Sequence, residues 1–303
     1  MLIGCVSCIQ SKKNVGEGDD DTLFHIKIEK PNFSSLKPLR LSEFVDSIAY
    51  VQLETSSKCL IPYYGTPAMS RVDDLLFMSD YLSIFKFNVI TGEYLCQIGR
   101  RGPGPKEYIQ AHIAIDKENS RVIVKSPDRQ NLLVYNYEGN HIHDMSLDDT
   151  NDSLFTDCFY SLALGKIDKK NMVFIADFMP AEQACHPHEL VIFDYENKKI
   201  VCTLPNRMEG TYNLFSVNIV GARFAIKQDD KLFYKSFYND TLYVVHEANI
   251  NPYAVVDLGT RKYPTEAIFS RNNNIISGKI LISNAYIHHK CILLECLLLN
   301  DDK

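Results

Sequence analysis

The feature that most constrains this chain is a pattern that recurs along its body about every fifty residues. In each unit an apolar strand is followed by a polar turn and a second strand rich in aromatic and branched residues. The first strands are Leu75–Met78, Arg121–Val124, Met172–Ile175 and Lys231–Tyr234, and the second strands are Ile84–Phe87, Leu133–Tyr137, Leu190–Tyr195 and Asp240–Val245. Successive units are offset by 50, 58 and 50 positions, counted between Phe87, Tyr137, Tyr195 and Val245. A unit of this length holds about four short strands, which is the content of one propeller blade.

The composition and the pattern within the strands agree with an all-β chain. The sequence holds 17 Tyr and 16 Phe, residues that favour pleated, half-buried surfaces. Alternation in Ile84–Phe87 is partial, which is typical of strands covered on both faces, and such sheets must stack on copies of themselves. No long segment has a helical period. A β-sandwich is the competing architecture, but it does not predict repeats of this length. We therefore predict an all-β protein, a β-propeller formed by residues 23–303.

Charge and motifs exclude several classes of function. The chain has 32 basic and 38 acidic side chains and a net charge of −6, so it lacks the clustered basic residues that nucleic-acid binding requires. No nucleophile elbow, zinc-protease motif or Walker loop is present. We predict no nucleic-acid partner, no cofactor and no catalytic residue.

A glycine-rich segment, residues 98–108, contains the candidate ligand-binding residues. Arg100, Arg101 and Lys106 are cations that can bind a carboxylate or phosphate, and Tyr108 supplies a ring that can stack on a sugar. The alternative is structural: the loop turns the chain between blades, and its arginines are solvated or pair with an acidic neighbour. No helical pattern follows the segment, so it is not a helix-based phosphate site.

Two clusters contain metal-ligand residue types, but neither predicts a metal site. In Cys185–Glu189 the histidines flank Pro187, which holds them on an extended turn. In His288–Cys291 the adjacent histidines of a strand would point to opposite faces of the sheet.

The N-terminal residues predict a membrane anchor. Leu2-Ile3-Gly4-Cys5 resembles the lipobox of bacterial lipoproteins, in which the cysteine receives the lipid. Only three residues precede Gly4, whereas a signal peptide has an apolar region of about 7–15 residues. The polar stretch that follows, up to Asp21, predicts a disordered tether, so residues 1–22 are set apart from the propeller domain. The alternative is an ordinary frayed terminus.

The glycine-rich segment also resembles a family signature. In the bacterial six-bladed β-propeller lipoproteins, relatives of the NHL-repeat propellers, a G-x-x-G-x-G-P-x-E-[YF] segment links one blade to the next. Here it is followed by Ile113–Asp116, which matches the return strand, and later by Asn239–Tyr243 and Asn251–Gly259, which match a late blade. The resemblance covers roughly residues 40–290, and it implies six blades.

The resemblance also sets expectations for the two ends of the propeller. We expect an opening strand at Ile48–Leu53 and two strands of a partial last blade at Ile280–Ser283 and Cys291–Leu294. That blade is expected to be incomplete, with an unpaired edge near the apolar run at residues 297–299 that favours aggregation.

Together these features predict a non-catalytic binding protein of the bacterial cell envelope, held at the membrane only through a lipid on Cys5. Its partner would be a protein or a glycan bound on the ring face. The alternative is a metal-dependent hydrolase or lyase that acts on glycans or lactones in the central channel. A third possibility is a structural remnant with an incomplete ring.

Overall fold

The computed structural model describes a chain built almost entirely of strands. It describes residues 23–28, 40, 47–61, 68–126, 131–147, 160–166, 170–176, 188–206, 224–228, 231–236, 239–264, 276–288 and 291–299. Within these ranges the one named helical element is a 3-10 turn, η5 (Gly259–Arg261). The chain divides into two compact units, residues 46–178 with 188–205 and residues 1–45 with 179–187 and 206–303.

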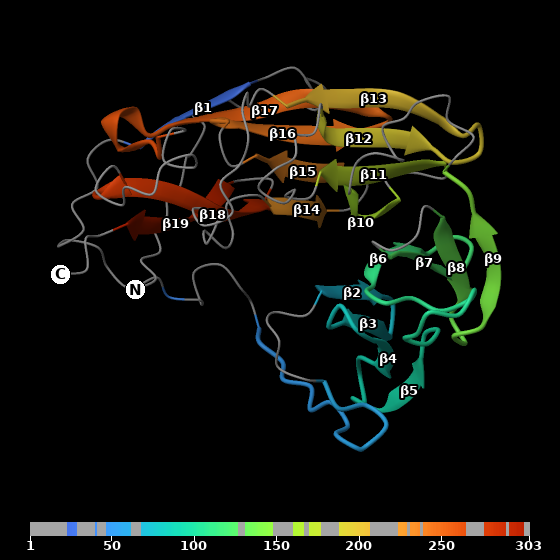
Figure 1. Ribbon diagram of the computed structural model, residues 1–303. Coiled ribbons are helices and arrows are strands. Elements are labelled where there is room, and N and C mark those ends of the chain that lie inside the picture. Colours follow the sequence, from blue (N-terminus) through green and yellow to red (C-terminus); the bar gives the residue numbers. More distant parts are fainter. Residues whose placement is uncertain are drawn as a thin grey trace. The chain divides into compact units, whose positions relative to one another are not determined.

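The unit that contains residues 46–178 holds three four-stranded antiparallel sheets, each with its strands in chain order (Figure 1). The first sheet is β2 (Ala68–Val72), β3 (Leu75–Ser79), β4 (Ile84–Asn88) and β5 (Tyr94–Gln97). The second is β6 (His112–Asp116), β7 (Arg121–Lys125), β8 (Leu132–Asn136) and β9 (His141–Met145). The third is β10 (Tyr160–Lys166), β11 (Asn171–Ala176), β12 (His188–Asp194) and β13 (Lys199–Pro205).

The other unit holds a fourth sheet of the same kind and a smaller one. The fourth sheet is β14 (Phe224–Gln228), β15 (Lys231–Lys235), β16 (Thr241–His246) and β17 (Asn249–Asp257). The strand β1 (Phe24–Lys27) pairs in parallel with β17 and extends this sheet to five strands. The smaller sheet consists of β18 (Lys279–His288) and β19 (Cys291–Leu299).

The predicted repeat is confirmed, and each of its units is a blade-like sheet. The paired strands read from the sequence are the second and third strands of the four sheets, β3 with β4, β7 with β8, β11 with β12 and β15 with β16. The return strand is β6, and the two strands expected near the C-terminus are β18 and β19. The fold is therefore all-β with propeller-like small sheets. The described residues form four such sheets and a two-stranded one, and a count of six is not shown.

One expected strand is absent. The opening strand at Ile48–Leu53 is wrong as a sheet member, because residues 47–54 belong to none of the sheets formed by the described residues.

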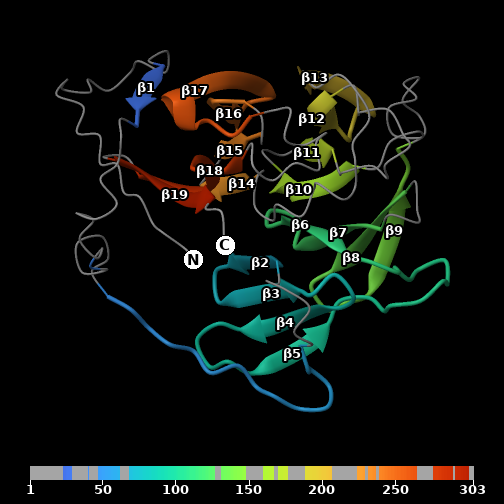
Figure 2. The same ribbon diagram turned by 60° about the vertical axis from the view of Figure 1, so that its left-hand side comes forward.

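The central strands carry the clearest pattern because apolar clusters cover both of their faces. On β7, Val122 and Val124 pack in a cluster shared with Phe77 and Ile84 of the first sheet. Ile123, which points the other way, packs in a cluster shared with the third sheet. Complete burial of a Val, Ile or Phe side chain stabilises a fold by roughly 1.5–3 kcal/mol. Stacking of successive sheets, visible in Figure 2 for β2–β5, β6–β9 and β10–β13, is thus what stabilises this unit.

The unit that contains β14–β19 is also stabilised by packing between its sheets. Phe233, Leu242 and Val256 of its larger sheet pack with Ile282 and Leu294 of the β18–β19 sheet.

Candidate functional site

The two ends of each sheet differ in the length of the connections between strands. The turns from first to second and from third to fourth strand lie at one end, which we call the turn end. The loops from second to third strand and the links to the next sheet lie at the other, the connection end. The turn end is tight, with only residues 73–74 between β2 and β3 and only residues 247–248 between β16 and β17. The links at the connection end are longer, among them residues 98–111 and 258–278. The chain available for binding is therefore at the connection end.

At the turn end, polar side chains are engaged locally. Asp194 accepts hydrogen bonds on Oδ1 from the N–H groups of Glu196 (3.1 Å) and Asn197 (2.9 Å), and on Oδ2 from Asn197 Nδ2 (2.8 Å). Asp116 forms the same arrangement with Asn119, whose backbone N–H and Nδ2 donate over 3.3 and 2.8 Å. Both carboxylates are buried, so these Asp-x-Glu-Asn turns have a structural role.

At the connection end, the link 98–111 is fixed at its C-terminal side by two buried serines. Ser79 Oγ donates to the carbonyl of Ala111 (3.0 Å), and the Ala111 N–H donates to the carbonyl of Tyr81 (2.8 Å). Ser126 Oγ accepts from the N–H of Ile109 (3.2 Å). Since Ser79 ends β3 and Ser126 follows β7, the link is held between the second-to-third loops of adjacent sheets.

The N-terminal side of the same link folds into a compact loop. The Gly102 N–H donates to the Tyr108 carbonyl (3.0 Å), and the Tyr108 N–H donates to the Arg100 carbonyl (3.1 Å). Glu107 bends back so that its Oε2 accepts from the Gly104 N–H (3.0 Å). A Cβ at position 102 or 104 would meet this carboxylate, so the Glu107 side chain would have to move to accommodate it.

The structure corrects the prediction made for Tyr108. Its side chain is fully buried, and its hydroxyl donates to the carbonyl of Ile98 (2.8 Å). Burial raises the pKa of this phenol to about 12. Its ring packs edge-on against that of Tyr135, whose hydroxyl donates to the Lys106 carbonyl (2.9 Å). The prediction that Tyr108 stacks on a sugar is wrong because its ring has no exposed surface. The two tyrosines instead pack beneath the loop and support its backbone.

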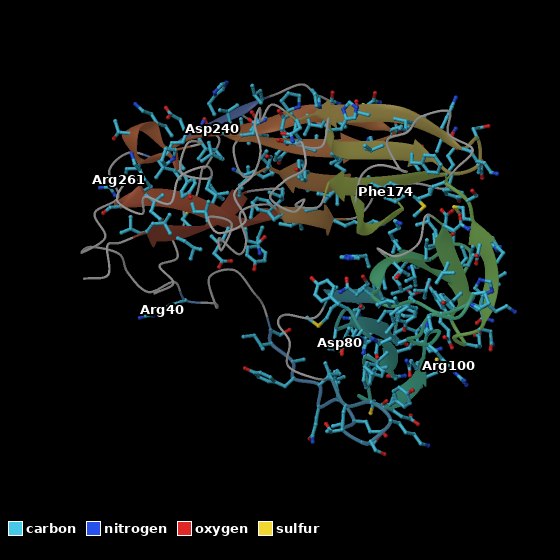
Figure 3. All side chains as sticks on the ribbon, in the orientation of Figure 1. Arg40, Asp80, Arg100, Phe174, Asp240 and Arg261 are labelled. Carbon is cyan, nitrogen blue, oxygen red and sulfur yellow. The ribbon has the colours of Figure 1, made fainter. Side chains whose placement is uncertain are left out.

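The three predicted cations lie on the outside of this loop. Arg100, Arg101 and Lys106 are exposed, and none of the residues that the structure describes forms an ion pair with them. Ile109 is 42% exposed on the same link. Figure 3 shows Arg100 at the outside of its unit near β5, whereas Asp80, near β3, is buried. The loop therefore presents positive charge from a backbone that hydrogen bonds hold in place.

Sequence reasoning missed a Lys-Ser dipeptide that occurs at the connection end of two sheets. Lys125 and Lys235 end β7 and β15, the second strands of their sheets, and a serine, Ser126 or Ser236, follows each of them. All four side chains are buried. Lys235 Nζ donates to the carbonyls of Ser236 (3.1 Å) and Asn239 (2.9 Å), and Lys125 Nζ donates to that of Ser126 (3.3 Å). The repeated Lys-Ser dipeptide was the available signal.

The remaining predicted positions lie mostly outside the described residues. Cys5, Cys185, His186 and His289 are outside them, as are the side chains of His288 and Cys291. His188 begins β12, and its Nδ1 is buried without a hydrogen-bond partner. Across the described ranges no three His, Cys, Asp or Glu side chains gather as metal ligands. Nor does any helix in them have the length and apolar character needed to span a membrane.

One comparison with a solved structure supports the fold. The chain superposes with a TM-score of 0.62 on the “Putative exported protein (BF0058)” of Bacteroides fragilis NCTC 9343, at 15% identity, covering 93% of this chain and 79% of that one. It also matches a member of the duf4221 family from Bacteroides vulgatus (TM-score 0.48, 12% identity, 68% and 61% covered) and the WD40 domain of Toxoplasma gondii coronin (0.38, 7%, 78% and 57%). The chain thus spans less than two thirds of the last two.

Sequence comparison identifies the family. No curated protein matches the chain. A family model described as a domain of unknown function, DUF4934, matches residues 23–303, which include all the strands described above. The chain therefore belongs to the DUF4934 family.

Proposed function

We propose that this protein is a non-catalytic binding propeller whose connection end recognises an acidic ligand, either a carboxylate-bearing glycan or an acidic protein surface. The observation that carries the proposal is the loop 98–108. Its three exposed cations have no acidic partner among the described residues, while the carboxylate of Glu107 within the loop is hydrogen-bonded to the Gly104 N–H.

The chemistry of the loop fits such a ligand. Arginine binds carboxylates through two parallel hydrogen bonds, which gives geometric selectivity as well as attraction. One exposed ion pair contributes only about 0.2–1 kcal/mol, so a useful affinity requires several contacts together. A loop that hydrogen bonds and buried tyrosines hold in place loses little entropy when it binds.

We also propose that the ring comprises six blades and that the protein is held at the bacterial envelope by a lipid on Cys5. The resemblance to six-bladed lipoproteins supports both statements. The β18–β19 sheet supports a blade beyond the four complete ones. The similarity in fold to the “Putative exported protein” of Bacteroides fragilis supports the location.

The experiment for the binding surface is a screen of the purified protein against acidic and neutral polysaccharides, followed by titration of each polysaccharide that binds. Arg100→Glu/Arg101→Glu should weaken binding to the acidic ligand at least tenfold. Lys117→Glu/Lys199→Glu makes the same charge change on exposed residues of the turn end and should change binding less than twofold. Equal losses in both variants, or no loss in either, would refute the assignment of the site.

The anchor is tested separately. Cells that express the protein are fed an alkyne-tagged fatty acid. The wild type should be labelled and should sediment with membranes, and Cys5→Ser should do neither. Labelling that persists in Cys5→Ser contradicts the anchor at this residue.

A further inference from the structure

The loop 98–108 begins where β5 of the first sheet ends, but it rests on a side chain of the second sheet. That side chain is Tyr135 of β8, which is 1% exposed. A Cβ at position 99 would lie 2.7 Å from the Cε1 and Cζ atoms of the Tyr135 ring, so the ring lies directly against the Gly99 backbone. The Tyr135 hydroxyl donates to the Lys106 carbonyl (2.9 Å). One ring therefore contacts both arms of the loop, just before Arg100 and at Lys106.

The second sheet holds Tyr135 in place. The ring packs edge-on against that of His141 on the neighbouring strand β9, with centroids 5.6 Å apart and 78° between the ring planes. The His141 Nε2 lies 2.6 Å from Asp144 Oδ1, which limits rotation of the imidazole. The turn between β8 and β9 adds a backbone contact, because the Gly99 N–H donates to the Gly139 carbonyl (3.1 Å). The second sheet thus supplies both a ring beneath the loop and a backbone acceptor at its start.

Two buried tyrosine hydroxyls bind carbonyls of this loop, but at different places. Tyr108 donates to the Ile98 carbonyl (2.8 Å), which precedes the first cation. Ile98 is also held by its own N–H, which donates to the Ile84 carbonyl (2.8 Å). Tyr135 instead donates to the carbonyl of Lys106, a residue that carries one of the three cations. Of the two hydroxyls, that of Tyr135 therefore acts directly on the backbone of a cation.

We propose that Tyr135 is a positioning residue for binding of the acidic ligand, because its hydroxyl holds the Lys106 arm of the loop at a fixed place relative to Arg100 and Arg101. This inference rests on the proposed function of the loop. Since one exposed ion pair contributes little, affinity requires that the three cations contact one ligand together, and a loop arranged in advance loses less entropy on binding. The site is therefore composite: the first sheet leads into the cations, and the second sheet sets their arrangement.

A double-mutant cycle tests the proposal on the full chain, with polygalacturonate, a polymer that has a carboxylate on each sugar, as the probe. Tyr135→Phe removes the hydroxyl, keeps the ring and should weaken binding about threefold, the scale of one exposed ion pair. Lys106→Ala removes the ammonium but keeps the carbonyl and should weaken binding at least as much. In Lys106→Ala, adding Tyr135→Phe should weaken binding less than 1.5-fold further, because the hydroxyl acts through Lys106.

Tyr108→Phe is the matched control, since it also removes one buried hydroxyl that binds a carbonyl of the loop. It should change binding less than twofold. Equal losses in Tyr135→Phe and Tyr108→Phe would show that Tyr135 acts only through stability. A Tyr135→Phe loss of the same size with and without the Lys106 ammonium would show that the hydroxyl does not act through this cation. Either result overturns the proposal.

Hydrogen exchange of the free protein separates this proposal from the proposed function. Amides within residues 102–108 are hydrogen-bonded inside the loop, among them those of Gly102 and Tyr108. In Tyr135→Phe they should exchange at least threefold faster, while the amides of β7 should be unchanged. Unchanged loop exchange would refute positioning by Tyr135 whether or not a polysaccharide binds. Faster loop exchange in a protein whose wild type binds no acidic polysaccharide would instead overturn the proposed function and leave Tyr135 as a support of the loop alone.

Discussion

The turn end and the connection end of the sheets use their polar residues differently. At the turn end, Asp116 and Asp194 are buried and bound to the neighbouring Asn side chains and backbone. At the connection end, buried serines and tyrosines hold the backbone of the link 98–111, while Arg100, Arg101 and Lys106 remain exposed. The turn-end carboxylates thus stabilise the sheets, whereas the connection-end cations are presented to solvent. Substitutions at the turn end should therefore reduce stability more than binding, and substitutions of the connection-end cations should reduce binding more than stability.

The largest stability effect is expected at Gly139. Gly139→Ala introduces a side chain at a φ of +86° and directs its Cβ into the Gln97 carbonyl of the adjoining sheet, so the free energy of unfolding should fall by about 3 kcal/mol. Gly259→Ala is the matched control, with a φ of +54° but open space around its Cβ, and should cost about 1 kcal/mol. Urea denaturation measures both, and equal costs would contradict the tight contact between the sheets.

A smaller loss is expected from Asp194→Ala, which leaves its donors at Glu196 and Asn197 without their acceptor. The free energy of unfolding should fall by about 2 kcal/mol. Asp240→Ala, which removes a partly exposed ion pair with Lys262 (2.7 Å) at the connection end, should cost less than about 1 kcal/mol. A larger loss at Asp240 would reverse the ranking of the two ends.

The Asp194 contribution should also depend on pH. Burial raises the pKa of this carboxyl, but hydrogen bonds from Asn197 and Glu196 and the charge of Lys170 outweigh burial and hold the pKa below the ordinary value of 3.8. Its stabilising effect is therefore fully present above that value and is lost as the pH falls through the lower, folded-state pKa. The difference between wild type and Asp194→Ala, measured by denaturation from pH 6 downwards, should shrink only below about pH 4. A difference that shrinks near pH 6 would contradict this assignment.

A still smaller loss, about 1 kcal/mol, is expected from Tyr108→Phe, which removes the hydrogen bond to the Ile98 carbonyl and leaves the buried ring in place. Binding of an acidic ligand should change less than twofold, because the ring contacts protein rather than ligand. A tenfold loss of binding in a stably folded Tyr108→Phe would restore this residue to the binding site.

The smallest stability effect is expected from Arg100→Glu/Arg101→Glu. Both side chains are exposed and unpaired among the described residues, so the free energy of unfolding should change by less than about 0.5 kcal/mol. A thermal melt checks this directly. Destabilisation above about 1 kcal/mol would indicate that these arginines stabilise the loop instead of serving a ligand.

The central strands could be predicted from the sequence because both of their faces are buried, which leaves unbroken apolar runs such as Leu132–Tyr135. The outer strands could not. In β9 (His141–Met145) the three middle residues are exposed, so the strand leaves little apolar signal. Residues 48–53 are the opposite case. Their sequence resembles that of a strand, but they pair with no strand among the described residues.

The candidate loop was located by its glycines and cations, but the role of its aromatic residue could not be read from sequence. Whether Tyr108 points outward or inward depends on how the loop folds back. That folding is set by distant contacts, such as the packing of its ring on Tyr135. The buried Ser79 and Ser126 were equally hidden, because their partners Ala111 and Ile109 lie on the link.

The most direct test of the division between the two ends is a pair of titrations with one acidic polysaccharide that binds the wild type. The dissociation constants of Arg100→Glu/Arg101→Glu and Lys117→Glu/Lys199→Glu are compared at the same ionic strength. The account predicts that the connection-end variant binds at least tenfold more weakly than the turn-end variant. Dissociation constants that agree within twofold, or a greater loss in the turn-end variant, would contradict it.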